Sequence, residues 1–203
     1  MVAQRLSIVV PALNEASGIR AALEALAPLR ARGHEVIVVD GGSSDDTVRI
    51  AQGLADKVIH APRGRALQMN AGARAASGDV LLFLHADTRL PPGAETLVFS
   101  SVWGRFDVEI DGRHPLLKVV ACGMNLRSRL TGIATGDQAM FVRRDAFPGF
   151  PEIPLMEDIA LSRLLKRRAA PACLRATVLT SGRRWESRGV LRQLERFHAW
   201  MRG

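Results

Sequence analysis

The chain of 203 residues contains no tyrosine, two cysteines and three lysines, and it has no long apolar run. Cys122 and Cys173 are too few for a disulfide framework and lack the spacing of a zinc site. No apolar stretch approaches the roughly 20 residues of a membrane-spanning helix. The first apolar run is short and leads directly to Asn14 and Glu15, which is not the layout of a secretory signal. We therefore expect a cytoplasmic protein, with peripheral contact at the inner face of the membrane left open.

The net charge of +8 comes from the second half of the chain. Residues 1–100 hold equal numbers of basic and acidic side chains, whereas residues 101–203 hold an excess of basic ones. Nearly all are arginines, whose planar guanidinium groups suit phosphates. Phosphate-bearing ligands, lipid head groups and nucleic acid all fit this charge, and an arginine-rich proteome would give the same bias. The lack of tyrosine and of any nucleic-acid-binding motif argues against a nucleic acid partner.

Residues 1–90 alternate between predicted strands and helices. The strands are short apolar runs at 6–11, 34–40, 57–62 and 80–87. The helices are expected at 18–31, 44–53 and 66–77. In the first helix one face carries Ile19, Leu23, Leu26 and Leu29. Alternation of this kind predicts an α/β fold with a mostly parallel sheet flanked by helices.

Residues 91–203 have a different pattern and predict a smaller antiparallel and helical region. A more exposed strand that suits antiparallel pairing is expected at 101–111, because apolar and polar residues alternate there. Further strands are expected within 136–147 and at 173–181. Helices are expected at 114–130, 156–168 and 188–201, and the last of these is amphipathic. The length favours a single domain, 1–203.

Polar side chains follow each of the four predicted parallel strands. They are, in chain order, Asn14 and Glu15, Asp40, Arg63 and Arg65, and His85 and Asp87. In parallel α/β sheets, ligands bind at the carboxyl ends of the strands. We therefore expect these side chains to share one ligand site.

Six segments and a tripeptide occur in an order that points to a known family. They are VVPALNE (9–15), VVDGGSSDDT (38–47), GRALQMNAGARAASGD (64–79), LFLHAD (82–87), TGDQAMFVRR (135–144), MEDIALSRLLKR (156–167) and RRW (183–185). Together they resemble a family 2 glycosyltransferase of the GT-A fold. The sequence GRALQMNAGA…FLHADTRLP further resembles that of a bacterial subgroup linked to arsenosugar biosynthesis.

The resemblance implies a metal-dependent, inverting transfer of a sugar. The donor would be a nucleotide-diphosphate sugar, most simply a UDP-sugar, and the acceptor a hydroxyl of a small or lipid-linked molecule. Residues 1–90 would bind the donor, and residues 91–203 would bind the acceptor. A homodimer is left open.

The donor site implied by the resemblance draws on every strand end. Its residues are Pro11, Ala12, Asn14, Glu15, Asp40, Gly41, Arg65, Asn70, His85, Ala86 and Asp87. Asp40 would accept a hydrogen bond from a base or ribose, although the family usually has two acids where this chain has Asp40-Gly41. Arg65 opens a helix whose N-terminus suits a diphosphate. Helix capping by Asn14, and an exposed helix position for Asn70, are the structural alternatives.

The motif His85-Ala86-Asp87 stands where the family has a pair of acids, DxD. By resemblance, Asp87 would bind Mn²⁺ or Mg²⁺, with phosphate and water completing the shell. In an extended strand, His85 and Asp87 would project to the same side, which would let His85 reach ribose, phosphate or Mn²⁺. The alternative for Asp87 is a plain turn residue.

The acceptor half carries the catalytic residues that the resemblance implies. Asp158 would be the general base, and Asp137 is the runner-up. The other residues expected around the acceptor and the diphosphate are Gly136, Gln138, Glu157, Arg183, Arg184 and Trp185. The two acids at 157 and 158 would also complement the N-terminus of their helix, and the basic tripeptide 183–185 would also suit a plain surface.

Two other functions fit parts of the pattern. A nucleotidyltransferase would need a glycine-rich basic loop after the first strand, and VVPALNE has neither glycine nor a basic residue. A basic nucleotide- or membrane-binding module without transferase activity remains the alternative, because the predicted helices at 114–130 and 188–201 are basic and amphipathic.

Overall fold

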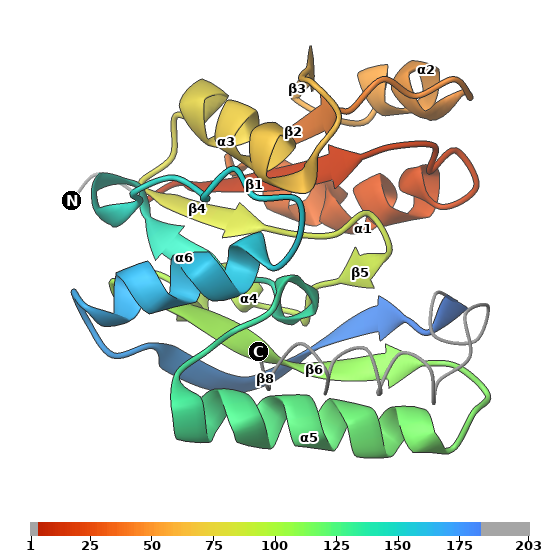
Figure 1. Cartoon of the computed structure of the whole chain (residues 1–203). Coiled ribbons are helices and arrows are strands. Elements are labelled where there is room, and N and C mark those ends of the chain that lie inside the picture. The colour runs from red at the N-terminus through yellow and green to blue at the C-terminus, as the bar shows by residue number, and fades with distance from the viewer. Residues whose placement is uncertain (1–3, 184–203) are drawn as a thin grey trace.

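A computed structural model describes residues 4–183. Its centre is an eight-stranded sheet with the order β3-β2-β1-β4-β7-β6-β8-β5 (Figure 1). The strands are β1 (Leu6–Ala12), β2 (Glu35–Asp40), β3 (Lys57–His60), β4 (Val80–Phe83), β5 (Thr88–Arg89), β6 (Trp103–Asp111), β7 (Phe141–Arg143) and β8 (Ala172–Ser181). The helices are α1 (Ile19–Ala31), α2 (Thr47–Gln52), α3 (Arg65–Ala75), α4 (Ala94–Leu97), α5 (Leu116–Thr131) and α6 (Glu157–Lys166), with short 3-10 turns η1 (Gly136–Gln138) and η2 (Arg144–Ala146).

The first four strands are parallel, as the alternation of strands and helices predicted. β1 pairs with β2 and β4, and β2 pairs with β3. Successive residues of β1 enter opposite faces of the sheet, so Ile8 packs in one core cluster and Val9 in the other. The predicted face of α1 is buried against the first cluster. α3 covers the other face closely, because a Cβ at Gly72 would lie 2.3 Å from the side chain of Val9.

The second half of the sheet is mixed. β7 is antiparallel to β4 and β6, whereas β6 is parallel to β8. The expectation of an exposed strand at 101–111 is wrong for its first half, since residues 103–106 are all buried between neighbouring strands. The predicted alternation of burial appears only from Asp107 onward.

The fourth strand ends earlier than the sequence predicted. β4 stops at Phe83, and the chain enters a turn in which the N–H of Thr88 bonds to the carbonyl of His85 at 3.0 Å. Leu84 remains buried although it lies outside the strand, because its N–H still bonds to Val9 O at 3.0 Å. The amphipathic helix predicted at 188–201 lies outside the described residues. Across residues 4–183, no helix has the length and apolar character to cross a membrane.

Candidate active site

A cleft of about 260 Å³ opens at the carboxyl ends of β1 and β4. It is lined by Pro11, Ala12, Leu13, Glu15, Arg63, Gly64, Arg65, Gln68, His85 and Ala86. Residues that follow three different parallel strands therefore meet in one place. The expectation of one shared site holds for Glu15, Arg63, Arg65 and His85, whereas Asn14, Asp40 and Asp87 do not line this cleft. The cleft is lined by the guanidinium-bearing residues Arg63 and Arg65 and by the imidazole of His85.

The loop after β1 is tied to the loop after β2. The backbone N–H of Asn14 donates to Ser43 Oγ at 2.9 Å, and the side-chain oxygen of Asn14 accepts from the N–H of Ser44 at 2.9 Å. The N–H of Glu15 donates to Thr47 Oγ1 at 2.8 Å. Asn14, with φ of 54°, thus serves to join the two loops and does not line the cleft.

Asp40 lies beneath the loop that follows β2. It is 1% exposed, and its carboxylate accepts hydrogen bonds from the N–H groups of Gly42 at 2.9 Å and Ser43 at 3.1 Å. Burial alone would raise the pKa of Asp40, but the hydrogen bonds from Ser43, Gly42 and His60 outweigh burial and hold it below its usual range. In this structure Asp40 holds the loop of Gly41 in place and does not line the cleft.

Gln68 was missed by the sequence analysis. Its Nε2 donates to the carbonyls of Ala12 and Val39, both at 2.8 Å, so one side chain joins the ends of β1 and β2 beside the cleft. Its signal was helical spacing, because Gln68 lies three residues after Arg65 and therefore on the same face of α3.

Asn70 is placed differently from its predicted ligand contact. Its amide donates to Phe150 O at 2.9 Å and accepts from Phe150 N–H at 2.8 Å. The side chain thereby fastens α3 to the segment before α6. Asn70 does not line the cleft.

Arg65 reaches from α3 toward the first turn of α6. Its Nη1 lies 3.5 Å from Oε1 of Glu157. Glu157 is 4% exposed, and burial raises its pKa above the usual range, while the nearby Arg65 and His85 lower it. The ion pair keeps the half-exposed guanidinium group at the edge of the cleft.

His85 lines the cleft and contacts the turn of η1. Its Nδ1 lies 3.2 Å from Oδ1 of Asp137, and the side chain is 9% exposed. Within residues 4–183, the buried Nε2 has no hydrogen-bond partner. A Cβ at Gly136 would lie 2.7 Å from this nitrogen, so glycine is needed for the ring to pack on the turn.

Asp158 is buried behind this turn and lines neither this cleft nor the adjoining one that contains Asp87. Its Oδ2 accepts from the N–H of Gly136 at 2.6 Å and its Oδ1 from the N–H of Ile159 at 2.7 Å. Burial raises the pKa of Asp158 above its usual range, although the two amides and Arg65 act in the opposite direction. A carboxyl group with a raised pKa is suited to proton transfer near neutral pH.

Asp87 lies in a second cleft of about 340 Å³, whose lining includes Asp111 and Arg183. The two clefts adjoin, because Glu15 and Ala86 line both. The prediction that His85 and Asp87 project to the same side of a strand is therefore wrong, because β4 ends at Phe83 and the chain turns between them.

The donor set around Asp87 limits the metal chemistry that it can support. No group of three or more His, Cys, Asp or Glu side chains in the described part of the chain could hold a metal ion by itself. A single carboxylate at the rim of adjoining clefts still fits Mn²⁺ or Mg²⁺ when phosphate oxygens and water supply the other ligands.

Arg183 closes the second cleft from the end of β8. Its guanidinium group donates to Oε2 of Glu15 at 3.1 Å and to Oγ of Ser17 at 3.3 Å. In this structure the side chain of Arg183 therefore contacts the loop after β1. Arg184 and Trp185 lie outside the described residues.

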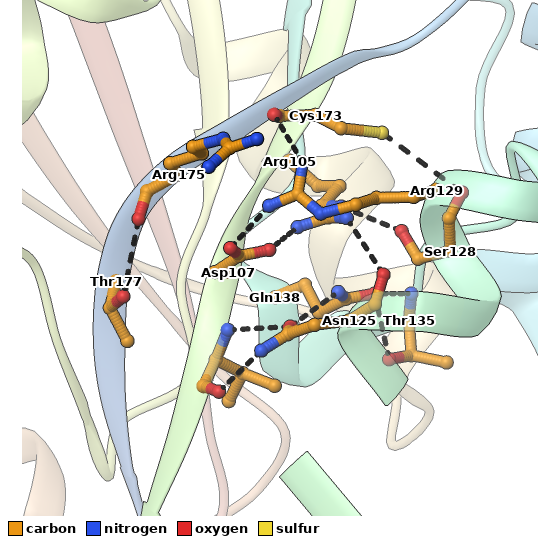
Figure 2. Close-up of polar contacts among 11 residues, drawn as sticks. Arg105, Asp107, Asn125, Ser128, Arg129, Thr135, Gln138, Cys173, Arg175 and Thr177 are labelled. Carbon is orange, nitrogen blue, oxygen red and sulfur yellow. Dashed lines mark hydrogen bonds and ion pairs between the residues drawn. The ribbon is translucent and has the colours of Figure 1, made fainter. Parts of the chain in front are cut away.

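The η1 turn is anchored from below by a polar network, which Figure 2 shows. Gln138, predicted to line the acceptor pocket, is fully buried, and its Nε2 donates to Oδ1 of Asn125 at 3.3 Å. Asn125 is itself bonded to both backbone groups of Val108, at 2.9 and 3.0 Å. The side-chain oxygen of Gln138 accepts from the N–H of Thr135 at 3.2 Å. The turn that carries Gly136 and Asp137 is therefore fixed to α5 and β6.

Known proteins share sequence and fold with this chain. The family model described as glycosyl transferase family 2 matches residues 7–114. A PGL/p-HBAD biosynthesis glycosyltransferase of Mycobacterium tuberculosis (strain ATCC 25177 / H37Ra) is 37% identical over 97 residues, which cover 44% of this chain and 38% of that protein. The matched part is thus less than half the length of that relative.

Two solved structures share the fold. Glucosyl-3-phosphoglycerate synthase from Mycobacterium tuberculosis, in complex with Mn²⁺, UDP and glucosyl-3-phosphoglycerate, is 19% identical with a TM-score of 0.63, covering 86% of this chain and 70% of that one. S. aureus TarS in complex with UDP is 21% identical with a TM-score of 0.70, covering 87% of this chain and 60% of that one. The match over 7–114 and the shared α/β fold show that the chain belongs to glycosyltransferase family 2 and has the GT-A fold.

Proposed function

We propose that the protein transfers a sugar from a nucleotide-diphosphate sugar, with UDP as the preferred nucleotide, to a hydroxyl acceptor. The observation that supports this most is the cleft between Arg65 and His85, which opens at the carboxyl ends of the parallel strands and is backed by the buried acids of α6. The two solved relatives described above were captured with UDP, one of them together with Mn²⁺. Residues 1–90 supply the donor cleft, and residues 91–203 supply the acceptor side.

The donor diphosphate lies at the start of α3 in this proposal. The free N–H groups of the first helical turn and the guanidinium groups of Arg63 and Arg65 suit its negative charge. The imidazole ring of His85 lines the same cleft. The loop of residues 11–13 lies beside the base and ribose.

Asp87 would hold Mn²⁺ or Mg²⁺ together with the diphosphate. Bound there, the metal would neutralise charge that develops on the leaving nucleoside diphosphate. Arg65, in the adjoining cleft, would contribute to the same neutralisation. Arg183 and Glu15 contact each other and line the same cleft as Asp87, so the charge around Asp87 depends on both residues.

The chemical step rests on Asp158. The acceptor oxygen attacks the anomeric carbon from the face opposite the leaving phosphate, the bond to the phosphate oxygen breaks, and the hydroxyl proton passes to the Asp158 carboxylate. Attack from the opposite face inverts the configuration at that carbon. Burial, which raises the pKa of Asp158, makes it a better base than an exposed carboxylate would be. Asp137, whose side chain is 35% exposed, is the alternative base.

The acceptor is a small or lipid-linked molecule that carries a hydroxyl group. The resemblance of residues 64–91 to the subgroup linked to arsenosugar biosynthesis makes an acceptor from such a pathway a hypothesis for this site.

Calorimetric titration with UDP, with and without Mn²⁺, tests the proposal. We expect Mn²⁺ to tighten UDP binding in the wild type and in Asp145→Ala, which removes an exposed carboxylate paired with Arg143. Asp87→Ala should bind UDP with equal affinity in Mn²⁺ and in EDTA. If the wild type itself binds UDP equally well in both, the metal role is wrong. If UDP binds but no UDP-sugar is hydrolysed or transferred, the protein is a nucleotide-binding module without transferase activity.

A further inference from the structure

The outer face of α5 is apolar and exposed. Val119, Leu126 and Leu130 are 65%, 56% and 77% exposed, whereas Leu117 and Val120 on the inner face are buried in the core. Spacings of seven and four residues place the three exposed side chains in one stripe along the helix. Figure 1 shows α5 at the edge of the molecule, where it lies along β6. We name Val119, Leu126 and Leu130 the α5 stripe.

The charges on α5 itself are all basic, whereas two carboxylates of β6, Asp107 and Glu109, line the groove beside the helix. α5 contains no acidic residue, and its Lys118 and Arg129 are exposed. Asp107, which lines the groove beside α5, is already paired with Arg105 and Arg129 (Figure 2). The helix therefore presents apolar side chains flanked by cations.

A second basic segment, at the end of α6, adjoins the C-terminal end of α5. Nζ of Lys166, in the last turn of α6, donates to the carbonyl of Thr131. A Cβ at Gly132 would contact both Lys166 and Pro171, so the ends of the two helices touch. Lys166 and the following Arg167 and Arg168 are exposed. The exposed cation Lys166 thus lies at the C-terminal end of α5, beyond Leu130.

We propose that the α5 stripe docks this protein peripherally on an anionic lipid surface. Apolar side chains that protrude from one helix can enter the boundary between head groups and acyl chains, while flanking lysines and arginines contact anionic head groups. The combination of protruding apolar side chains and a helix that carries only basic charges favours an anionic bilayer over a second copy of the chain, whose own basic α5 would repel it. This inference stands apart from the proposed function, since it uses no residue of the cleft.

Vesicle flotation of the full chain tests the proposal. The probes are vesicles of phosphatidylcholine mixed with phosphatidylglycerol, and vesicles of phosphatidylcholine alone. We expect the wild type to float with the anionic vesicles only and to be released by high salt. The double variant Leu126→Ser/Leu130→Ser should partition at least about tenfold less, because two leucines lose their burial in the bilayer. Lys118→Glu/Lys166→Glu should also bind less.

Leu155→Ser provides the matched control. Leu155 is 62% exposed but precedes the opposite end of α6, so its variant should float like the wild type. UDP affinity, measured in parallel, should be unchanged in all variants and reports separately on the proposed function. Equal flotation of the double variant and the wild type would overturn the proposal. So would light scattering that finds a wild-type dimer converted to a monomer by Leu126→Ser/Leu130→Ser, because a second copy would then cover the stripe.

Discussion

The guanidinium group of Arg65 lies 3.5 Å from the carboxylate of Glu157, so the first residue of α3 meets the first residue of α6. α3 belongs to the parallel half of the fold and α6 to the half that carries Asp137 and Asp158. The pair therefore joins the half of the chain proposed to bind the donor to the half proposed to bind the acceptor.

Glu157→Gln should weaken UDP binding. The substitution keeps the shape of the side chain but removes the charge that holds Arg65. Because Arg65 is 41% exposed, we expect a modest loss of about three- to tenfold in affinity. Glu95→Gln is the matched control, since Glu95 is also largely buried and pairs with Arg32 at 2.7 Å without lining the cleft. Equal UDP affinity of Glu157→Gln and wild type in calorimetry would remove Arg65 from the donor site.

Asn125→Leu should slow transfer without weakening UDP binding. Asn125 anchors Gln138, and Gln138 anchors the turn that carries Gly136 and Asp137. Loss of the anchor should lower kcat at least several-fold while the dissociation constant of UDP stays within about twofold, because the donor residues do not contact Asn125. Some loss of stability, about 1–3 kcal/mol, is also expected.

Arg129→Gln separates positioning from stability. Arg129 belongs to the same network but bonds to Asp107 and to the carbonyl of Cys173, not to the turn (Figure 2). The substitution should therefore destabilise the fold. At a temperature well below the unfolding midpoint of the variant, kcat should change little. If both variants lower kcat in proportion to their loss of stability, Asn125 has no positioning role.

Glu35 should make the stability depend on acid pH. Burial alone would raise its pKa, but the bonds from Lys57, Ser7 and Ser77 outweigh burial and lower it to about 2, against 4.5 for an unperturbed glutamate. Because the folded pKa is the lower one, the stabilisation is complete above pH 4.5 and is lost as the pH falls toward 2. The loss is about 3 kcal/mol of unfolding free energy. Urea unfolding across this window should show that Glu35→Gln lacks this part of the pH dependence, and identical slopes would contradict the assignment.

The elements with strong periodicity were predictable from sequence. The buried face of α1 and the parallel strands β1 and β2 follow directly from apolar spacing. The end of β4 was not predictable from the sequence, because residues 84–86 stay buried although they lie outside the strand. A continuous apolar run does not indicate where the extended backbone stops.

The position of the candidate site was predictable in outline, but the hydrogen-bond partners of its Asn and Gln side chains were not. Asn70 and Gln138 were assigned to ligands because they are polar residues within family motifs. Their partners in the structure are Phe150 and Asn125, which the sequence does not mark as neighbours. Gln68 was overlooked for the same reason, since the two carbonyls that it binds belong to β1 and β2, far from α3 in the sequence.

The proposed transfer at this cleft depends most directly on Asp158. A general base contributes about 10²–10⁴ in rate and does not bind the donor. Asp158→Asn should therefore keep UDP-sugar affinity within a factor of about three, which is below roughly 1 kcal/mol. It should lower transfer at least about a hundredfold, with donor hydrolysis as the first assay.

The decisive measurement sets Asp158→Asn beside Asp137→Asn in one assay of UDP-sugar affinity and donor turnover. We predict that both variants bind the donor normally, that Asp158→Asn loses at least about a hundredfold in turnover, and that Asp137→Asn loses much less. Near wild-type turnover of Asp158→Asn together with an inactive Asp137→Asn would move the base to Asp137. Unchanged turnover in both variants would contradict base-assisted inverting transfer at this site.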